Sequence, residues 1–482
     1  MATTTQRPTE SRPSSAPPTE APPYHLRGRE LFRYLRAAAR HDPLGPLCRI
    51  PGAPGIIKIT AAPANDIFIV RSPEQTRQVL ITNQDRYTKD VNYQILAVLL
   101  GRGLLTNPDP GNWQRQRALV QPMFAKRHLA PMAGHMTAAA TDWLDRWDTE
   151  PDGRPIDVAA AMNALTLDVV DRALFGVRVD DETTALVGHA MTDVLHAGAT
   201  YLRQGPATRL GMKAGLELDT ILRARSRQWR KAQRAITALD GVVQPMIDRH
   251  EADPDADQEN LLALLLAARD EETGTGMSRE QVRDEVMTFL AAGHETTANA
   301  LGWMWLLLSR HPEVREQLHA EVDAVLGGRE PTAEDVDNLP YTAAVFQESM
   351  RLYPPVPAIS RESVAEDEVG GARVRPGSTM FILPYVLHRD PTIWPNPEGF
   401  DPRRFLHADP HRPRQAFMPF GAGRRICVGS GFALMEGILL AAMIAQRYTF
   451  DLEPGADVVP EASITYRPLD GLPMVLRKRE CG

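Results

Sequence analysis

The sequence predicts a mainly α-helical protein with a minor β region. Helix-like spacing of apolar residues dominates between residues 113 and 353, and its longest stretch runs from 278 to 309. Segments 56–70 and 356–380 differ, because they combine Ile- or Val-rich runs with the Gly and Pro residues of strands and turns. No internal repeat is present, which argues against a repeat architecture.

The elements can be placed in chain order. Helices are expected over 31–40, 113–124, 129–147, 158–174, at both ends of 183–249 around an irregular basic stretch at 205–215, over 278–309 and over 341–353. A capping box, Ser278-Arg279-Glu280-Gln281, opens the longest helix, and His311-Pro312 ends it. A β-hairpin is expected over 463–476.

The composition is that of an ordinary globular protein. The 482 residues are 43% hydrophobic and 24% charged, and the net charge of −7 gives no reason to expect nucleic-acid binding. The three cysteines are far apart, so neither a disulfide framework nor a zinc site is indicated, and a cytoplasmic location fits. Residues 1–23 are rich in Thr, Ser and Pro and are expected to be a disordered tail. We expect neither a signal peptide nor a membrane anchor.

Cys427 has the most specific surroundings of any residue. Segment 420–429 reads Phe-Gly-Ala-Gly-Arg-Arg-Ile-Cys-Val-Gly and precedes an apolar, helix-like run. A thiolate there could ligate a haem iron, because glycines allow a tight turn under a flat macrocycle and a helix N-terminus stabilises the charge. Phe420 could shield the sulfur, and Arg425 could bind a haem propionate. The alternative is a buried free cysteine at a glycine-rich turn.

The segment matches every fixed position of the pattern Phe-x-x-Gly-x-Arg-x-Cys-x-Gly, and the chain resembles the cytochrome P450 family over about residues 31–479. The resemblance implies the cytochrome P450 fold, with one catalytic domain over 24–482 instead of the roughly two to four domains that length alone suggests. It implies haem b as the cofactor and Cys427 as the axial iron ligand, an arrangement that favours O–O cleavage. The cofactor contacts implied by this segment are Phe420, Gly421, Arg425 and Gly429.

A second motif, Ala-Gly-His-Glu-Thr-Thr at 292–297, lies in the middle of the longest helix. Thr296 can donate to the carbonyl of Ala292, which bends the helix and opens a polar notch, and the two small residues would let the backbone approach a flat ligand. Alone, it could be a helix with a few misplaced polar residues. It matches the oxygen-activation motif of the family, which assigns Thr296 to ordering a proton-delivering water and Glu295 to the proton relay. His294 is expected to be polar and solvated.

Glu348 and Arg351 share one face of the helix expected over 341–353. Alone they could form a surface ion pair worth about 0.2–0.5 kcal/mol. Downstream, segment 400–405 resembles the second arginine motif of the family, with Arg404 in the key place. By this resemblance the three side chains form a buried triad that holds the cysteine loop.

Trp113 and Arg117, four residues apart, lie on one face of the helix expected over 113–124. An indole N–H and a guanidinium both suit propionate oxygens, although a half-buried amphipathic helix would also place them so. The family has a matching Trp-x-x-x-Arg, which assigns both to the haem propionates, with Arg361 as a weaker third candidate.

Substrate contacts follow from the alignment of these motifs, and core packing explains the same residues equally well. If they do line a pocket, the substrate is hydrophobic. The predicted pocket residues are Leu99, Leu100, Ala292, Thr296, Val356, Ala358 and Ile464.

The resemblance implies a soluble bacterial haem-thiolate monooxygenase that hydroxylates or epoxidises a hydrophobic molecule, such as a polyketide, a terpenoid or a fatty acid. Desaturation, cyclisation or oxidative coupling would use the same oxidant. The Glu295–Thr296 pair argues against a peroxygenase, and a haem sensor or carrier would not need Thr296. No flavin or iron–sulfur module follows, so we expect a ferredoxin and a ferredoxin reductase as electron donors. Arg115, Arg414 and Arg424 could form part of the basic patch on which the ferredoxin docks.

Overall fold

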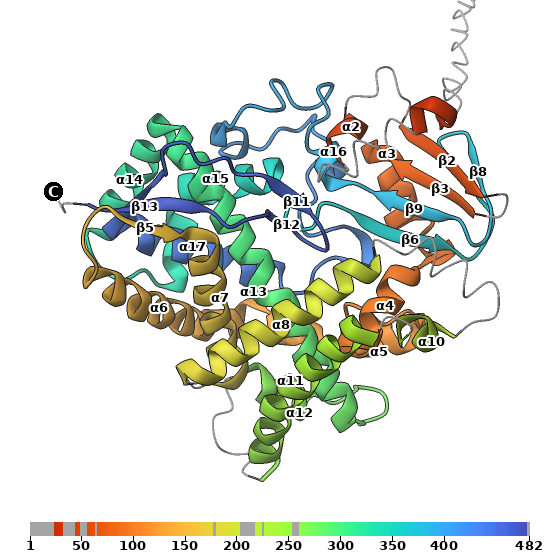
Figure 1. The fold of residues 1–482 in the computed structure, drawn as a ribbon, viewed down its shortest axis with the longest axis horizontal. Coiled ribbons are helices and arrows are strands. Elements are labelled where there is room, and N and C mark those ends of the chain that lie inside the picture. Colours follow the sequence, from red (N-terminus) through yellow and green to blue (C-terminus); the bar gives the residue numbers. More distant parts are fainter. Residues whose placement is uncertain are drawn as a thin grey trace, which may run out of the picture.

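The computed structural model describes residues 24–31, 44–48, 55–62, 65–176, 180–202, 217–223, 226–252 and 260–479. Most of them are helical, as predicted (Figure 1). The helices are α2 (Gly45–Cys48), α3 (Pro73–Arg77), α4 (Val91–Leu100), α5 (Pro110–Val120), α6 (Lys126–Asp148), α7 (Val158–Phe175), α8 (Asp181–Leu202), α10 (Leu218–Arg223), α11 (Ser226–Ala252), α12 (Leu261–Ala267), α13 (Arg279–Arg310), α14 (Pro312–Leu326), α15 (Pro340–Leu352), α16 (Pro384–Leu387) and α17 (Ser430–Arg447).

Helix α13 runs through the middle of the helical region and packs along α7, α15 and α17 (Figure 1). Its start is the predicted capping box, because Gln281 N–H donates to Ser278 Oγ and Ser278 N–H donates back to Gln281 Oε1. Almost all of its second half is buried, including Trp303 and Trp305. A helix that is apolar on nearly all sides must have neighbours on all sides, which explains its central place.

Within the described part of the chain, the strands form one large sheet and three small ones. The six-stranded sheet has the order β1-β2-β3-β9-β6-β4 and lies at one end of the molecule, at the right of Figure 1. Its β1–β2 and β3–β9 pairs are parallel and the others antiparallel. The strands are β1 (Tyr24–Leu26), β2 (Ile56–Ala62), β3 (Asn65–Val70), β4 (Tyr87–Thr88), β5 (Arg154–Asp157), β6 (Ile359–Ser363), β7 (Asp367–Val369), β8 (Ala372–Val374), β9 (Thr379–Ile382), β10 (Tyr448–Leu452), β11 (Pro460–Ala462), β12 (Tyr466–Pro468) and β13 (Pro473–Lys478).

The prediction of a single β-hairpin over 463–476 is wrong. Strand β12 pairs with β11, so the hairpin turns at 463–465, whereas β13 pairs with β10 and β5 in a separate sheet. The sequence of β13 alternates no differently from that of a hairpin strand, and its partner β5 lies more than 300 residues earlier in the chain. Pairing over such a separation has no local signal. The helix predicted over 31–40 lies, apart from its first residue, outside the described residues, as do the stretch 205–215 and the tail 1–23.

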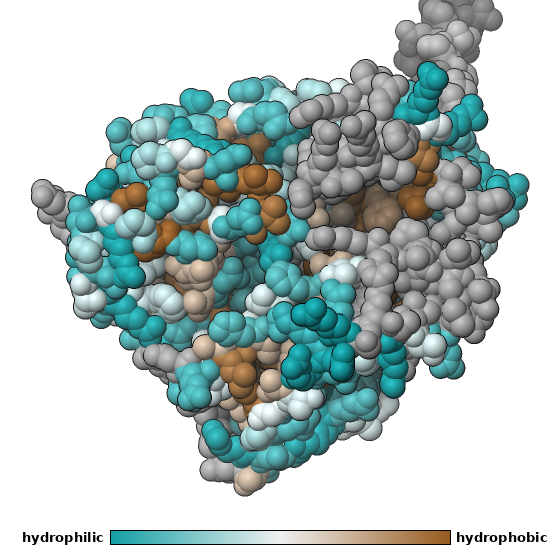
Figure 2. All heavy atoms as spheres, in the orientation of Figure 1, coloured by the Kyte–Doolittle hydropathy of each residue, from teal (hydrophilic) through white to brown (hydrophobic). Residues whose placement is uncertain are grey.

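Hydrophilic residues dominate the face of the molecule drawn in Figure 2, and apolar residues appear there as small separate patches. Among the residues that the structure describes, the exposed large apolar side chains are similarly scattered, at Leu186, Val364, Ile426 and Val459. Within the described ranges, no helix is both long and apolar enough to cross a membrane.

Candidate active site

The cysteine loop joins the short 3-10 turn Gly423–Arg425 to the N-terminus of α17. Cys427 N–H donates to the Phe420 carbonyl at 2.9 Å, which closes the loop on itself. Gly421 and Gly423 both have positive φ angles, of 75° and 73°, and a Cβ on Gly423 would overlap the carbonyl oxygen of Leu80. Glycine at 423 is therefore required both by the backbone conformation and by a neighbouring chain segment.

The Cys427 side chain is accessible to solvent, although enough protein surrounds it that burial raises the pKa of the thiol. Two groups act in the opposite direction: the Gly429 N–H donates to the sulfur, and the positive charge of Arg117 is close. The N–H and the guanidinium would favour a thiolate, so the loop is arranged to stabilise negative charge on this sulfur. Because Cys427 is exposed, a planar ligand could approach its sulfur from the solvent side.

Three cations gather beside the loop. Lys89 and Arg361 are buried, at 5% and 8% exposed, and Arg425 stacks over the Trp113 ring at 4.2 Å. Burial lowers the pKa of Lys89 well below its usual value, and the charges of Arg361 and Arg425 lower it further. Burial also lowers the pKa of Arg425 to about 10, again with Arg361 contributing. Like charges held together away from water are costly unless an anion joins them.

These cations donate mainly to backbone carbonyls. Lys89 Nζ donates to Leu105 O, Arg425 Nη1 to Asn107 O at 2.9 Å, and Arg361 Nη1 to Ser360 O at 2.8 Å. Among the charged groups that act on Lys89, Asp90 is the one acid. The cluster therefore has an excess of positive charge, as a site for a dianionic ligand would. The backbone carbonyls that accept these hydrogen bonds carry no net charge, so they do not neutralise the excess positive charge of the cluster.

Trp113, Arg361 and Arg425 were predicted from the sequence as cofactor contacts, whereas Lys89 was not. The signal was weak: lysine is rare in this chain, and Lys89 follows a two-residue strand that no pattern predicts. Arg117 lies outside this cation cluster, at the cysteine loop: its Nη1 donates to the Ile426 carbonyl at 2.8 Å and its Nε to Gln121 at 3.0 Å. Its assignment to the propionates stays a prediction.

The notch in α13 has the predicted hydrogen bond, from Thr296 Oγ1 to Ala292 O at 2.8 Å. The expectation that His294 is solvated is wrong. The ring is 4% exposed, its Nδ1 lies 2.6 Å from Leu290 O, and burial lowers its pKa. Helix α7 covers this side of α13, and Thr166 of α7 donates to the His294 carbonyl at 3.0 Å.

Gly293 serves helix packing instead of close approach to a flat ligand. A Cβ on Gly293 would lie 2.9 Å from a methyl group of Val170 on α7. This distance is too short for two carbon atoms, so the glycine sets how closely α7 and α13 approach each other. Of the two small residues expected to let a flat ligand approach the helix backbone, only Ala292 can still serve this role, and it is exposed.

We expect Gly293→Ala to destabilise the protein. The gain in helix propensity is about 1 kcal/mol, whereas overpacking against Val170 costs about 1–3 kcal/mol. Gly241→Ala is the matched control, because Gly241 lies within α11 and a Cβ there has no atom within 4 Å among the described residues, so it should stabilise by about 0.5–1 kcal/mol. Urea unfolding measures both. In the Val170→Ala background, Gly293→Ala should no longer lower the free energy of unfolding. If Gly293→Ala and Gly241→Ala stabilise the parent protein equally, the packing role is contradicted.

Glu348 and Arg351 are both 0% exposed. Arg351 Nε and Nη2 donate to the two Glu348 oxygens at 2.7 and 2.8 Å, a forked pair. Arg404 Nε lies 3.3 Å from Glu348 Oε1 but outside hydrogen-bond geometry, so we regard this contact as an ion pair. The surface-pair alternative is excluded for Glu348 and Arg351, since both charges are buried and matched.

His388 links this triad to the cysteine loop. Arg351 Nη1 donates to the His388 carbonyl at 2.9 Å, and His388 Nε2 accepts from the Met418 N–H at 2.9 Å. With Nε2 an acceptor, the ring proton is on Nδ1, which can donate to Arg351 O at 3.2 Å. Burial lowers the pKa of His388 to about 3, so the ring stays neutral in this role. Met418 in turn accepts from the Gly421 N–H at 3.0 Å, at the start of the loop.

The predicted pocket residues converge only in part. Leu99 of α4 and Ile464 of the β11–β12 turn meet at Gly198 of α8, where a Cβ would lie 3.5 and 3.2 Å from them. Leu100 belongs to the main core, and Ala358 packs against the core cluster beside the six-stranded sheet. Gly198 itself was missed, because a glycine inside a helical pattern does not reveal what it faces.

The cytochrome P450 family model matches residues 62–465, most of the chain. The chain belongs to the cytochrome P450 family. It is 37% identical to cyclooctatin synthase of Streptomyces melanosporofaciens over 441 residues, which are 89% of this chain and 91% of that protein. It is 34% identical to cyclooctat-9-en-7-ol 5-monooxygenase of the same organism over 414 residues, 86% of each. Its fold is similar to the crystal structure of the cytochrome P450DA heme domain, with a TM-score of 0.82, 26% identity and coverage of 96% of this chain and 99% of that one.

Membership confirms the predicted fold, the haem cofactor and the assignment as a cytochrome P450 monooxygenase. The residues fit this cofactor. Haem carries two propionates, and the buried cluster of Lys89, Arg361 and Arg425 has the matching excess of positive charge. Haem iron takes a thiolate ligand in cytochromes P450, and Cys427 offers an accessible sulfur with two charge-stabilising neighbours.

Proposed function

We propose that this cytochrome P450 hydroxylates or epoxidises a hydrophobic secondary metabolite of the terpenoid type. The observation that carries the chemistry is the Thr296 notch, where a helix hydroxyl is bonded to Ala292 O and the preceding residue in the chain is the acid Glu295. The substrate class rests on a relative named for acting on cyclooctat-9-en-7-ol, an unsaturated alcohol. The apolar side chains around Gly198 suit such a molecule and would offer little to a carboxylate.

In this proposal Cys427 would supply the thiolate that ligates the haem iron, and Trp113, Lys89, Arg361 and Arg425 would hold the propionates. When bound, haem supplies the electron transfer and the oxygen chemistry. The Cys427 sulfur keeps its hydrogen bond from Gly429 N–H, and Phe420 and Gly421 close the loop beneath it.

Thr296 and Glu295 would move protons. Because the Thr296 hydroxyl donates to Ala292 O, its oxygen lone pairs remain as acceptors for a water molecule. A water held there is oriented toward the notch. The half-buried Glu295 carboxylate can exchange protons with solvent and pass them on.

Thr296→Val should uncouple the enzyme. Valine keeps the shape but removes the oxygen that accepts from water, so protons would arrive less reliably. We expect reductant consumption to continue while product per reductant falls by up to roughly a hundredfold, with hydrogen peroxide released instead. The measurement is product and peroxide per reductant consumed. Thr192→Val, which removes the same kind of back-bond from α8, is the control. Unchanged coupling in Thr296→Val would favour a peroxygenase or a haem carrier.

Desaturation, cyclisation and oxidative coupling remain second candidates, because they need the same haem and the same proton relay. Product mass after turnover separates them: insertion adds one oxygen atom, whereas desaturation removes two hydrogens. The same experiment tests the terpenoid proposal if terpenoid, polyketide and fatty-acid substrates are compared. Turnover of fatty acids alone would contradict it.

Cytochromes P450 need redox partners, and we propose a ferredoxin with its reductase. Of the three arginines predicted to form its docking patch, Arg414 and Arg424 are exposed and Arg115 is half-buried. Arg424 is already paired with Asp85, and Arg115 donates to Gln281 at 3.0 Å. The patch is therefore weaker than the sequence suggests.

A single catalytic domain over 24–482 is part of the same proposal, supported by a main core that extends from Val91 to Leu476.

A further inference from the structure

The turn of the β11–β12 hairpin touches the proton-relay acid. We name residues 463–465 the hairpin tip. Thr465, which is 5% exposed, donates from Oγ1 to Glu295 Oε1 at 2.8 Å. A hydrogen bond from a buried hydroxyl favours one position of a carboxylate over others. The tip therefore determines where the Glu295 carboxylate lies, and no motif in the sequence indicates this contact.

The residue after the tip is fixed on two sides. Tyr466 N–H donates to Pro355 O at 2.9 Å, and Tyr466 O accepts from Trp303 Nε1 of α13 at 2.8 Å. Within the tip, Ser463 N–H donates to Thr465 O at 2.9 Å. Ile464 and Thr465 thus lie in a tight turn with an anchored end.

Ile464 forms part of the apolar lining at Gly198. A Cβ on Gly198 of α8 would lie 3.2 Å from Ile464 and 3.0 and 3.5 Å from Leu96 and Leu99 of α4. Three segments distant in sequence therefore meet there through apolar side chains. A hydrophobic ligand that enters between them has to move Ile464, because well-packed side chains leave no spare volume.

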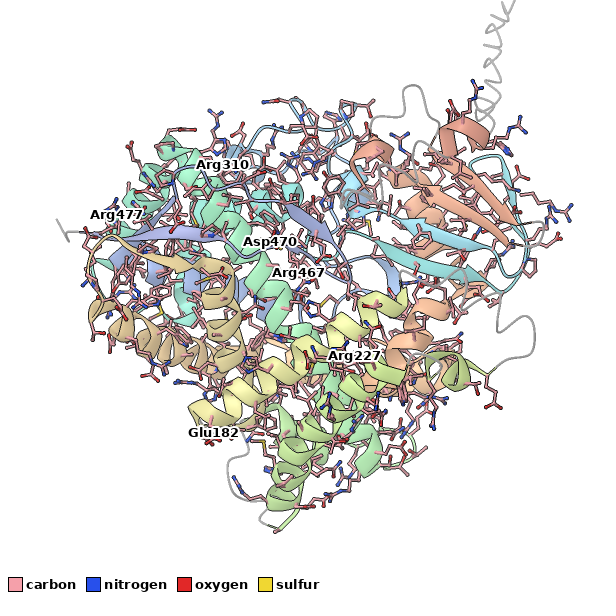
Figure 3. All side chains as sticks on the ribbon, viewed as in Figure 1. Glu182, Arg227, Arg310, Arg467, Asp470 and Arg477 are labelled. Carbon is pink, nitrogen blue, oxygen red and sulfur yellow. The ribbon has the colours of Figure 1, made fainter. Side chains whose placement is uncertain are left out.

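The charged groups of the hairpin, Glu461 and Arg467, bind each other and His196, and the Glu295 charge acts to raise the pKa of His196. Arg467, labelled in Figure 3, donates to Glu461 at 2.9 Å and lies 2.8 Å from Nε2 of His196 on α8. These bonds hold the hairpin to α8. Thr465 is the partner whose hydrogen bond reaches Glu295 directly.

We propose that Thr465 is a positioning residue for the Glu295 carboxylate, and that the hairpin tip makes the position of this carboxylate depend on whether a ligand displaces Ile464. The proposal rests on the proposed role of Glu295 in proton delivery. Without a ligand, Thr465 holds Glu295 toward the tip. A ligand that moves Ile464 loosens this bond and frees the carboxylate to turn toward the Thr296 notch. Proton delivery is then available mainly when substrate is present.

Two substitutions at 465 test the positioning. Thr465→Val has the same shape without the donor, whereas Thr465→Ser keeps the donor. Crystal structures of the ligand-free holoenzymes should show the Glu295 carboxylate displaced in the valine variant and unchanged in the serine variant and in the Thr192→Val control. An unmoved carboxylate in Thr465→Val overturns the positioning role, whatever the enzyme's activity.

Kinetics add a readout that a merely structural role would not change. In Thr465→Val, the rate of oxygen consumption without substrate, divided by the rate with substrate, should rise by about two- to tenfold, the range set by one hydrogen bond. The spectrally measured affinity for substrate should stay constant, and Thr465→Ser should behave like the parent protein. An unchanged ratio of the two rates overturns the positioning role. If the parent protein consumes no oxygen with any substrate, the proposed function fails, and the crystal structures still decide the role of Thr465.

The coupling to ligand is tested with two azole probes of different size. Clotrimazole is large enough to reach the apolar lining, whereas imidazole is not. In the clotrimazole complex we expect Ile464 to be displaced and the Thr465–Glu295 pair to separate beyond hydrogen-bond distance, and in the imidazole complex both should stay as they are. An unmoved Ile464 in the clotrimazole complex, or a displaced Ile464 with the hydrogen bond intact, overturns the coupling.

Discussion

Cys427→Ser is expected to abolish the thiolate signature of the reduced, carbon-monoxide-bound protein. The parent protein should show a strongly red-shifted Soret band, because a thiolate pushes electron density onto the iron. A serine hydroxyl is not ionised near pH 7 and cannot replace it. The substitution changes one atom and keeps the main-chain bond from residue 427 to Phe420 O, so the loop itself should survive. The reduced, carbon-monoxide difference spectrum measures this.

Cys48→Ser is the matched control for this substitution. Cys48 is half-buried at the end of α2, and it has no place in the proposed site. Its spectrum should equal that of the parent. A red-shifted band that survives in Cys427→Ser, or a histidine-type band in the parent, would contradict ligation by Cys427 and would reopen every role proposed around it.

Arg351→Ala should yield haem-free, strongly destabilised protein. Arg351 is 0% exposed and makes a forked pair with Glu348 plus hydrogen bonds to the carbonyls of His388, Pro397 and Gly399. Truncation leaves Glu348 as a buried charge without its main partner, at a cost of about 3–5 kcal/mol. The break also reaches the cysteine loop through His388 and Met418. Haem content per protein and the free energy of unfolding are the measurements, and Glu348→Ala should act alike.

Two variants separate the loss of the fork from a general loss of charge. Arg351→Lys keeps the charge but cannot donate a forked pair, so it should retain only part of the haem. Arg154→Ala removes one partner of an exposed ion pair with Glu150 and should cost no more than about 1 kcal/mol. Normal haem content in Arg351→Ala would show that the triad does not support the cysteine loop.

The site could be predicted from sequence wherever a side chain acts on a neighbour close in the chain. The Thr296–Ala292 bond and the Glu348–Arg351 fork both follow from helical spacing, and both are present. Lys89, His388 and Thr465 could not be found in this way. Each acts on residues far away in sequence, at the cation cluster, at Met418 and at Glu295.

The sequence by itself determined the helical framework, the capped start of α13, the glycine-rich cysteine loop and the family, because these depend on local spacing and on which residue types a backbone conformation tolerates. The tertiary structure alone decided that β13 pairs with β10 and β5, that His294 is buried and that Gly293 serves the packing of α7 on α13. The reason is common to all three. Burial and strand pairing depend on which segment arrives from elsewhere in the chain, and the local sequence carries no record of its partner.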